Sequence, residues 1–143
     1  MAGVPGYFYT QSAVIPCRLR KGRIEVLLIT SRRRKRWIIP KGVVEPGLGA
    51  RRSAAKEALE EAGIEGYVEQ DALGAYTYGK WGGTCTVQVF VMHVRIVHGE
   101  WEEDFRERAW VPLDDAKKNI KNKKLKNCFD KLPEILASSR FPA

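Results

Sequence analysis

Residues 40–64 read PKGVVEPGLGARRSAAKEALEEAGI, and this stretch decides the fold. Its first half is a glycine-rich loop, and its second half is rich in alanine, lysine and glutamate, which predicts a helix over residues 50–62. Helical residues three and four positions apart share one face, so the helix presents three neighbouring carboxylates. These are Glu57, Glu60 and Glu61.

Three carboxylates on one helix face repel each other, and packing alone does not require them. Such a cluster is explained by a positive partner, and carboxylate oxygens are the ligands that hard divalent cations prefer. The sequence therefore predicts a metal site for Mg²⁺, with Mn²⁺ as the alternative.

The bulk composition indicates one folded domain spanning residues 1–143. The chain is 44% hydrophobic and lacks a long apolar run, so a membrane span is not expected. Its first residues, MAGVPGYFYTQ, have neither the basic start nor the apolar core of a secretory signal. Three scattered cysteines without CxxC spacing argue against a disulfide framework or a zinc site. We therefore expect a reduced, cytoplasmic protein.

The formal net charge of +8 indicates an anionic partner. Two basic stretches supply much of it, the run SRRRKR at Ser31–Arg36 and six lysines between Lys117 and Lys126. Such runs are commonly solvated surface. The first one directly precedes the glycine-rich loop, and this position favours contact with phosphate groups.

Hydrophobic patterning predicts strands on either side of this loop and helices at the end of the chain. Residues 11–19 and 24–30 predict a hairpin, with Pro16 indicating an edge strand or a bulge. Residues 84–97 predict a strand with apolar side chains on both faces, covered from both sides. Other expected elements are strands within 37–40, 67–78 and 108–112, and helices over 116–120, capped by Asp114, and 123–138, interrupted at Pro133. Together they predict an α/β fold, an α/β/α sandwich around a mixed sheet.

Gly42 and the run Lys56–Ile64 resemble the Nudix box, G-x5-E-x7-R-E-U-x-E-E-x-G-U with U aliphatic, which would span residues 42–64. The resemblance implies the Nudix fold and hydrolysis of a nucleoside diphosphate, or another diphosphate, linked to a further group. Two positions depart from the motif: Leu48 stands where a glutamate is expected, and Lys56 stands where an arginine is expected. Lysine keeps the charge but loses the planar guanidinium.

The resemblance also assigns roles at the site. It implies that Glu57, Glu60 and Glu61 are catalytic and bind the metal together with the carbonyl of Gly42. The base that deprotonates the attacking water is placed by the family either in the box, here Glu60 or Glu61, or in a later loop, here Glu102 or Glu103.

Segments outside the box are similar to diphosphoinositol polyphosphate phosphohydrolases and their diadenosine polyphosphate-cleaving relatives. Ser31, Arg32 and Lys80 correspond approximately to phosphate-holding positions of that group. The predicted substrate-binding residues are Ser31, Arg32, Arg33, Arg36, Lys41 and Lys80, and the predicted partner is a small-molecule polyphosphate.

Three other readings of the sequence stay open. The chain can act on ordinary nucleotides, ADP-sugars or capped RNA, with Trp81 either stacking on a base or packing its hairpin. It can be a catalytically silent phosphate binder, because Leu48 replaces a motif glutamate. It can also be a nucleic-acid-binding module that uses the net charge.

Overall fold

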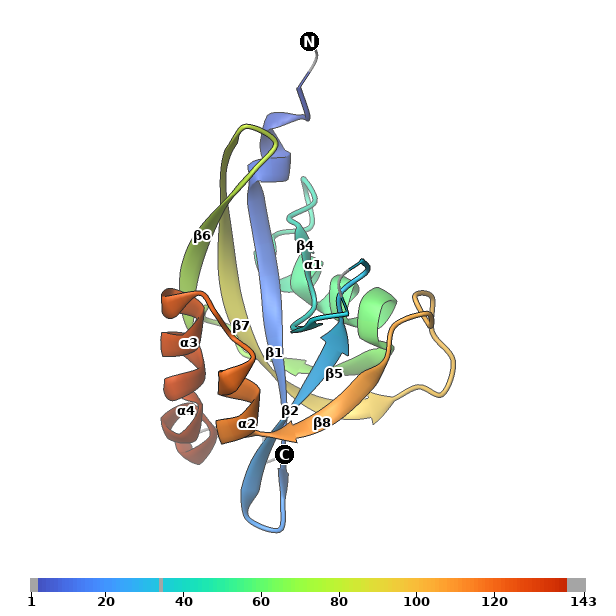
Figure 1. The fold of residues 1–143 in the computed structure, drawn as a ribbon, viewed down its shortest axis with the longest axis vertical. Helices are drawn as coiled ribbons and strands as arrows, with labels where there is room; N and C mark the ends of the chain where they lie inside the picture. The colour runs from blue at the N-terminus through green and yellow to red at the C-terminus, as the bar shows by residue number, and fades with distance from the viewer. Residues whose placement is uncertain (1–2, 34, 139–143) are drawn as a thin grey trace.

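The computed structural model describes residues 3–33 and 35–138, and its centre is a mixed eight-stranded sheet (Figure 1). The strands are β1 (Thr10–Arg20), β2 (Arg23–Thr30), β3 (Trp37–Ile38), β4 (Lys41–Val43), β5 (Ile64–Val68), β6 (Gly74–Lys80), β7 (Gly83–Val97) and β8 (Arg108–Pro112). The helical elements are η1 (Gly6–Tyr9), α1 (Ala50–Glu57), η2 (Ala58–Ala62), α2 (Leu113–Lys118), α3 (Lys123–Asp130) and α4 (Leu132–Ser138).

Strand β1 runs through the middle of the sheet, whose main path is β3-β2-β1-β7-β5. It pairs in parallel with β7 along one side. Along its other side it pairs with β4 through residues 11–13 and then with β2 through residues 17–20, antiparallel in both cases. Strands β6 and β8 extend the sheet by antiparallel pairing with β7 and β2.

The prediction of an edge strand or bulge at Pro16 is wrong, because Pro16 lies in this central strand. The N–H of Val14 donates to the carbonyl of Pro40 (3.2 Å), and nitrogens two positions apart in a strand face the same way. The nitrogen of Pro16 therefore faces the point where β1 changes its partner from β4 to β2. A missing N–H is tolerated there.

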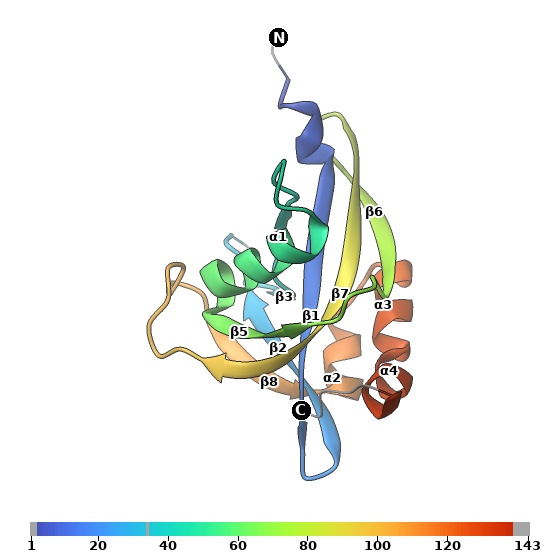
Figure 2. The same cartoon turned by 180° about the vertical axis from the view of Figure 1, so that it is seen from behind.

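Helices cover both faces of the sheet, as the sequence predicts (Figures 1 and 2). Val87, Val89 and Val91 of β7 pack in the core that α2, α3 and α4 cover. Phe90 and Met92, which alternate with them, pack in the second core with the alanines of α1 and η2. The α/β/α sandwich is thus confirmed, with strand residues alternating between its two cores.

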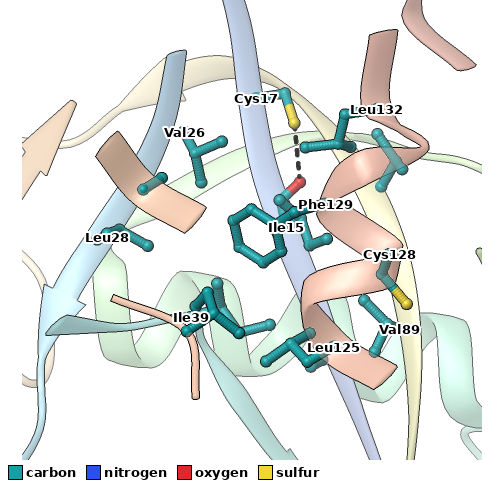
Figure 3. Close-up of a cluster of buried hydrophobic side chains, with 14 of the residues drawn as sticks. Ile15, Cys17, Val26, Leu28, Ile39, Val89, Leu125, Cys128, Phe129 and Leu132 are labelled. Carbon is teal, nitrogen blue, oxygen red and sulfur yellow. Dashed lines mark hydrogen bonds between the residues drawn. The ribbon is translucent and has the colours of Figure 1, made fainter. Parts of the chain in front are cut away.

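Figure 3 shows how the C-terminal helices close the first core. Leu125, Phe129 and Leu132 point from α3 and α4 toward Ile15 and neighbouring residues of the sheet, and Phe129 is fully buried. The break between α3 and α4 comes at Lys131, just before Pro133, so the predicted interruption is confirmed.

Two predictions about local structure are wrong. Asp114 lies in the first turn of α2, whose N-cap position is Pro112, and it is Asn122 that caps a helix, accepting from the N–H groups of Lys124 and Leu125 in α3. Strands β4 and β5 were not predicted, because each is short and contains a glycine. Among the described residues, no helix is long and apolar enough to cross a membrane.

Candidate active site

The carboxylate helix changes its winding where the carboxylates begin. It is α-helical from Ala50 to Glu57 and continues as a π-helical turn from Ala58 to Ala62, so the α-helix predicted through residue 62 ends earlier. Gly63, with φ of 66°, ends it in the left-handed region that glycine favours. π-helical turns are rare and recur at functional sites.

The glutamates separate into a pair and a single residue. Glu57 and Glu61 are hydrogen-bonded to each other. Glu61 also accepts the backbone N–H of Lys41, with Oε1 at 3.3 Å from the nitrogen. A Cβ at Gly42 would lie 2.5 Å from Oε2 of Glu57, a distance that side chains do not adopt. Only glycine at position 42 lets the β4 backbone come this close to the pair.

Burial makes these two carboxylates unusually weak acids. It raises the pKa of Glu57. Burial, followed by the charge of Glu57, raises the pKa of Glu61 to about 8, although Arg106 opposes the shift. The desolvated pair therefore tends to keep a proton near neutral pH, and a cation at the same place would replace it.

Glu60 turns away from the pair toward Lys56, whose ammonium lies 3.9 Å from Oε2 of Glu60 and 2.7 Å from Oε2 of Glu45. The backbone N–H of Glu45 donates to Oγ of Ser53 in α1 (2.9 Å), which fixes the loop on the helix. Glu45 stands three positions before Leu48, so it is out of register with the glutamate of the motif. The structure instead joins Glu45 to Lys56, the second residue that departs from the motif.

The donors at this site fit a hard divalent cation, although the chain does not present them as a finished site. Among the residues that the structure describes, no group of three or more His, Cys, Asp or Glu side chains is arranged to hold a metal ion. The available groups are carboxylate oxygens, and these suit Mg²⁺ or Mn²⁺ better than softer metals. The half-buried carboxylate pair and the narrow space at Gly42 match the place of such an ion.

The loop between β7 and β8 is docked on the end of this helix. The last three carbonyls of η2 each accept a hydrogen bond from this loop or from Arg108, the first residue of β8. The donors are the N–H of Glu103 to Glu60 (3.0 Å), Nε1 of Trp101 to Glu61 (3.1 Å) and Nη1 of Arg108 to Ala62 (2.9 Å). The Arg108 guanidinium also lies 3.7 Å from the centre of the Trp101 ring. These bonds satisfy carbonyls that a helix end otherwise leaves unpaired.

The β7–β8 loop also contains Glu102 and Glu103, the two candidates for the catalytic base that lie outside the box, and their surroundings differ. Glu102 is exposed, whereas the carboxylate of Glu103 accepts from Nε and Nη2 of Arg106 (3.0 and 2.9 Å). Arg106 is 8% exposed and also donates to the carbonyl of Thr30 (2.8 Å). Sequence reasoning missed Arg106, because only the folded loop brings it to the carboxylates.

One cleft of about 650 Å³ contains the carboxylate pair and all of the predicted substrate-binding residues. Its lining is Phe8, Gln11, Ser31, Arg32, Arg33, Arg36, Ile38, Lys41, Gly42, Val43, Glu57, Glu61, Lys80, Trp81 and Arg106. Segments far apart in the sequence thus meet here: η1 with the start of β1, the loop before β3, strand β4, the carboxylate helix, the β6–β7 hairpin and the β7–β8 loop. Glu60 and Glu103 are not part of this lining.

The basic side chains of the cleft differ in burial. Lys41 is largely buried, and its ammonium donates to the hydroxyl of Tyr78 (3.0 Å), which in turn donates to Gln11 (2.7 Å). Burial lowers the pKa of Lys41, while Glu61 opposes that shift. Arg32, Arg33 and Arg36 are exposed instead. Arg32 contacts the carboxylate of Glu103 (Nη2 to Oε1, 3.5 Å), and an exposed ion pair of this kind is weak enough for an incoming anion to compete with it.

Ser31 holds the basic loop in shape. Its Oγ accepts the N–H of Arg36 (3.0 Å), and its own N–H donates to the Arg36 carbonyl (2.7 Å). The hydroxyl hydrogen is left to donate outward. Ser31 therefore orients the arginines as well as lining the cleft.

Two other clefts lie away from the carboxylate pair. One of about 720 Å³ borders the first and shares Arg36, Lys41 and Lys80 with it. A larger one, about 810 Å³, lies between the β5–β6 loop and α4 and is lined by both acidic and basic side chains. The candidate active site is identified by its residues and not by its volume, because Gly42 and the Glu57–Glu61 pair line the 650 Å³ cleft.

A family model described as the NUDIX domain matches residues 9–132. The chain belongs to the Nudix hydrolase family. Nudix hydrolases generally need divalent metal cations and act on small, nucleotide-type molecules, and this Nudix chain is accordingly a pyrophosphohydrolase. The family assignment agrees with the cleft, in which oxygen donors face cations.

Curated relatives of this Nudix chain come from plants and animals. "Nudix hydrolase 13, mitochondrial" of Arabidopsis thaliana is 27% identical over 91% of this chain and 76% of its own length. "Diphosphoinositol polyphosphate phosphohydrolase 3-alpha" of Mus musculus is 32% identical over 76% of this chain and 67% of its own length. Some relatives carry mitochondrial or chloroplastic in their names, so the cytoplasmic location stays a prediction.

Solved structures share the fold at low identity. A C. elegans Ap4A hydrolase in a binary complex has a TM-score of 0.72 and 24% identity, covering 91% of this Nudix chain and 98% of its own. A MutT protein from Methanosarcina mazei Go1 has a TM-score of 0.65 and 20% identity, covering 87% and 92%. These likenesses confirm the predicted Nudix fold.

Proposed function

We propose that this Nudix hydrolase uses a divalent cation, Mg²⁺ or Mn²⁺, to hydrolyse a phosphoanhydride in a nucleoside-diphosphate-linked or polyphosphorylated substrate. Substrates of the diadenosine polyphosphate or diphosphoinositol polyphosphate type fit this description. One observation carries the proposal: the Glu57–Glu61 pair lies against the backbone of Gly42 in a cleft that is also lined by Arg106 and by five further cationic side chains. These are Arg32, Arg33, Arg36, Lys41 and Lys80.

The basic and the acidic side chains of the cleft have different roles in this reaction. The arginines and Lys80 bind the phosphate oxygens and offset charge that builds up on them as the bond breaks. Oxygens of Glu57 and Glu61, with Glu60 and the Gly42 carbonyl, would hold the cation. When bound, the cation draws electron density from phosphate oxygens and makes water more acidic.

A carboxylate must accept the proton of the attacking water. Glu57 and Glu61 line the cleft, whereas the other candidates, Glu60, Glu102 and Glu103, do not. Geometry therefore favours an oxygen of the Glu57–Glu61 pair as the acceptor. Glu103, held by Arg106, then adds negative charge next to the pair and supports the bound cation.

Chromatographic separation of the products formed from a panel of substrates tests the proposal, because cleavage between two substituted phosphates gives two phosphate esters and no inorganic phosphate. The panel is a diadenosine polyphosphate, a diphosphoinositol polyphosphate, ADP-ribose and a nucleoside triphosphate, each with Mg²⁺ and with Mn²⁺. We expect turnover of at least one, and a fall in kcat of about a thousandfold in Glu57→Gln. Glu65→Gln is the matched control, because Glu65 is exposed and pairs with His98 outside the cleft.

A silent phosphate binder is the second candidate, and Leu48 at a motif glutamate position favours it. Binding of these compounds without turnover of any would select it. Turnover that Glu57→Gln leaves unchanged would remove the carboxylate pair from the mechanism.

A further inference from the structure

The cleft of about 720 Å³ beside the active site is lined by basic side chains from four parts of the chain. These parts are the β2–β3 loop, the start of β4, the end of β6, and the end of α2 with the connection that follows it. The six residues are Lys35, Arg36, Lys41, Lys80, Lys118 and Lys121. Within the described residues 3–33 and 35–138, no acidic side chain lines this cleft. Like charges around one hollow repel each other, and packing does not require them.

The protein itself neutralises these charges weakly. In the described part of the chain, the salt bridge among the six is that of Lys118 with Asp115, at 3.4 Å, and both side chains are largely exposed. An exposed pair of this kind contributes little to stability, so an incoming anion can replace the carboxylate. The cleft therefore favours an anionic ligand from outside the chain.

The connection between α2 and α3 is anchored on both sides of Lys121. Ile120 is buried in the core, and Asn122 caps α3 and donates from Nδ2 to the Thr77 carbonyl on β6 (3.3 Å). Lys121 stands between these two anchors, so its backbone is fixed although its side chain is exposed. On the β2–β3 loop, Lys35 has a φ of 54°, a region in which residues other than glycine are uncommon. The backbone thus sets where each lysine begins, and the flexible side chains can adjust to a ligand.

This cleft is joined to the 650 Å³ cleft by shared cations. Arg36, Lys41 and Lys80 line both. The ammonium of Lys41 donates to the hydroxyl of Tyr78 (3.0 Å), and Tyr78 belongs to the 720 Å³ cleft. The cations that line the 720 Å³ cleft and not its neighbour are Lys35, Lys118 and Lys121. A ligand held by this second set would lie next to the groups that face the substrate.

We propose that the 720 Å³ cleft is a second phosphate-binding site, whose own cations are Lys35, Lys118 and Lys121. A phosphate group carries about two negative charges and three acceptor oxygens, so it matches a cluster of cations better than a carboxylate does. Its phosphates come from the end of the substrate remote from the cleaved bond, or from a separate polyphosphate that acts as an effector. The site goes beyond the proposed function, because binding there requires no hydrolysis.

Binding of inorganic tripolyphosphate to the metal-free protein, followed by NMR of the backbone amides, tests this site. We expect the amides of residues 76–78 and 119–122 to shift. The double variant Lys118→Gln/Lys121→Gln should weaken the binding that these amides report by about tenfold at low ionic strength, because charge-assisted contacts are lost. Lys123→Gln/Lys124→Gln is the matched control and should stay within about twofold of the wild type. It removes the same charge from the same segment, at exposed side chains that do not line the cleft.

The absence of shifts at residues 119–122 in the wild type would overturn the second site. Equal losses in the two double variants would also overturn it, because the binding would then reflect net charge alone. Tripolyphosphate binding at these residues without hydrolysis of any diphosphate would instead overturn the proposed function and leave the second site standing.

Steady-state kinetics of the same variants distinguishes the two sources of phosphate. For a substrate that reaches the second site, Lys118→Gln/Lys121→Gln should raise KM for a diadenosine polyphosphate about fivefold more than for ADP-ribose, which carries only a diphosphate. For a separate effector, tripolyphosphate should change the turnover of saturating ADP-ribose, in excess free Mg²⁺, in the wild type and not in this double variant.

Discussion

The two walls of the cleft are built in opposite ways. The acidic wall, Glu57 and Glu61 against the backbone of Lys41 and Gly42, is half-buried and hydrogen-bonded, and it comes from one continuous stretch of sequence. The basic wall, made of the exposed arginines of the 31–36 loop and Lys80, comes from separate loops and points into solvent.

This difference separates chemistry from selection of the substrate. Fixed groups position a cation and a water within tenths of an ångström, and exposed side chains adapt to different phosphate chains. Substitutions in the acidic wall should therefore change kcat and the free energy of unfolding strongly. Substitutions in exposed ion pairs should change both only slightly. Four predictions test this contrast, in order of decreasing effect.

Gly42→Ala should break the acidic wall by steric conflict. Its Cβ would meet the Glu57 carboxylate at a distance that forces this side chain to move. We expect kcat to fall by about 100-fold or more, since displacements of about 1 Å have effects of that size. Steady-state kinetics measures it, with Gly99→Ala as the control, because a Cβ at Gly99 meets nothing within 4 Å. Full activity in Gly42→Ala would contradict the close packing at this position.

Arg106→Ala should destabilise the β7–β8 loop, because Arg106 links Glu103 of this loop to the carbonyl of Thr30. It removes the closest cation of the Glu103 carboxylate and the hydrogen bond that Arg106 donates to the Thr30 carbonyl. We expect the free energy of unfolding to fall by about 2 to 4 kcal/mol. Thermal or urea unfolding measures it. Removing Glu103 as well should cost less than the two single losses added together, and strict additivity would mean that the two residues do not act as a pair.

The pH dependence of stability should reveal the buried pair in metal-free protein. The folded-state pKa of Glu61, about 8, is above its ordinary value of 4.5. The favourable contribution of the neutral carboxyl is therefore complete below pH 4.5 and is lost as the pH rises through about 8. Glu61→Gln should stabilise the metal-free protein at pH 8.5 by about 1 to 3 kcal/mol and flatten this dependence. The same dependence in both proteins would place the titration elsewhere.

Glu45→Gln should have the smallest effect, because Glu45 and Lys56 form an exposed pair. Such pairs contribute little, and we expect kcat/KM to change by less than about threefold. Lys56→Arg should likewise stay within about threefold of the wild type. A loss of tenfold or more in either variant would show that the pair orients Glu57 and so belongs functionally to the acidic wall.

The features that the sequence predicted correctly are those that depend on local patterns of residues. Alternating residues of β7 predicted both cores correctly, because periodicity is a local property that burial imposes directly. The box predicted where Glu57 and Gly42 would lie, because close approach of a backbone requires glycine. All six predicted substrate-binding residues reach one cleft, although their role in binding remains a prediction.

What sequence reasoning missed depends on contacts between distant segments. Arg106 and Trp101 gain their roles only when the β7–β8 loop docks on η2, and no local pattern marks that event. The π-helical turn is similar, since its composition fits an α-helix equally well. Pro16 misled the prediction because a strand can change partners along one edge, and only the sheet topology shows where.

The parallel pairing of β1 with β7 also has a consequence for how the protein folds. Thr10 pairs with Thr86, so most of the chain must be ordered or looped out before this central ladder can form. Closing so long a loop has a large entropic cost, and folds dominated by such contacts form slowly. Gln11 on β1 and Trp81 on the β6–β7 hairpin reach the cleft only after that step. We therefore expect ligand binding to appear together with the last cooperative stage of folding, so that a newly made chain acquires its activity late and all at once.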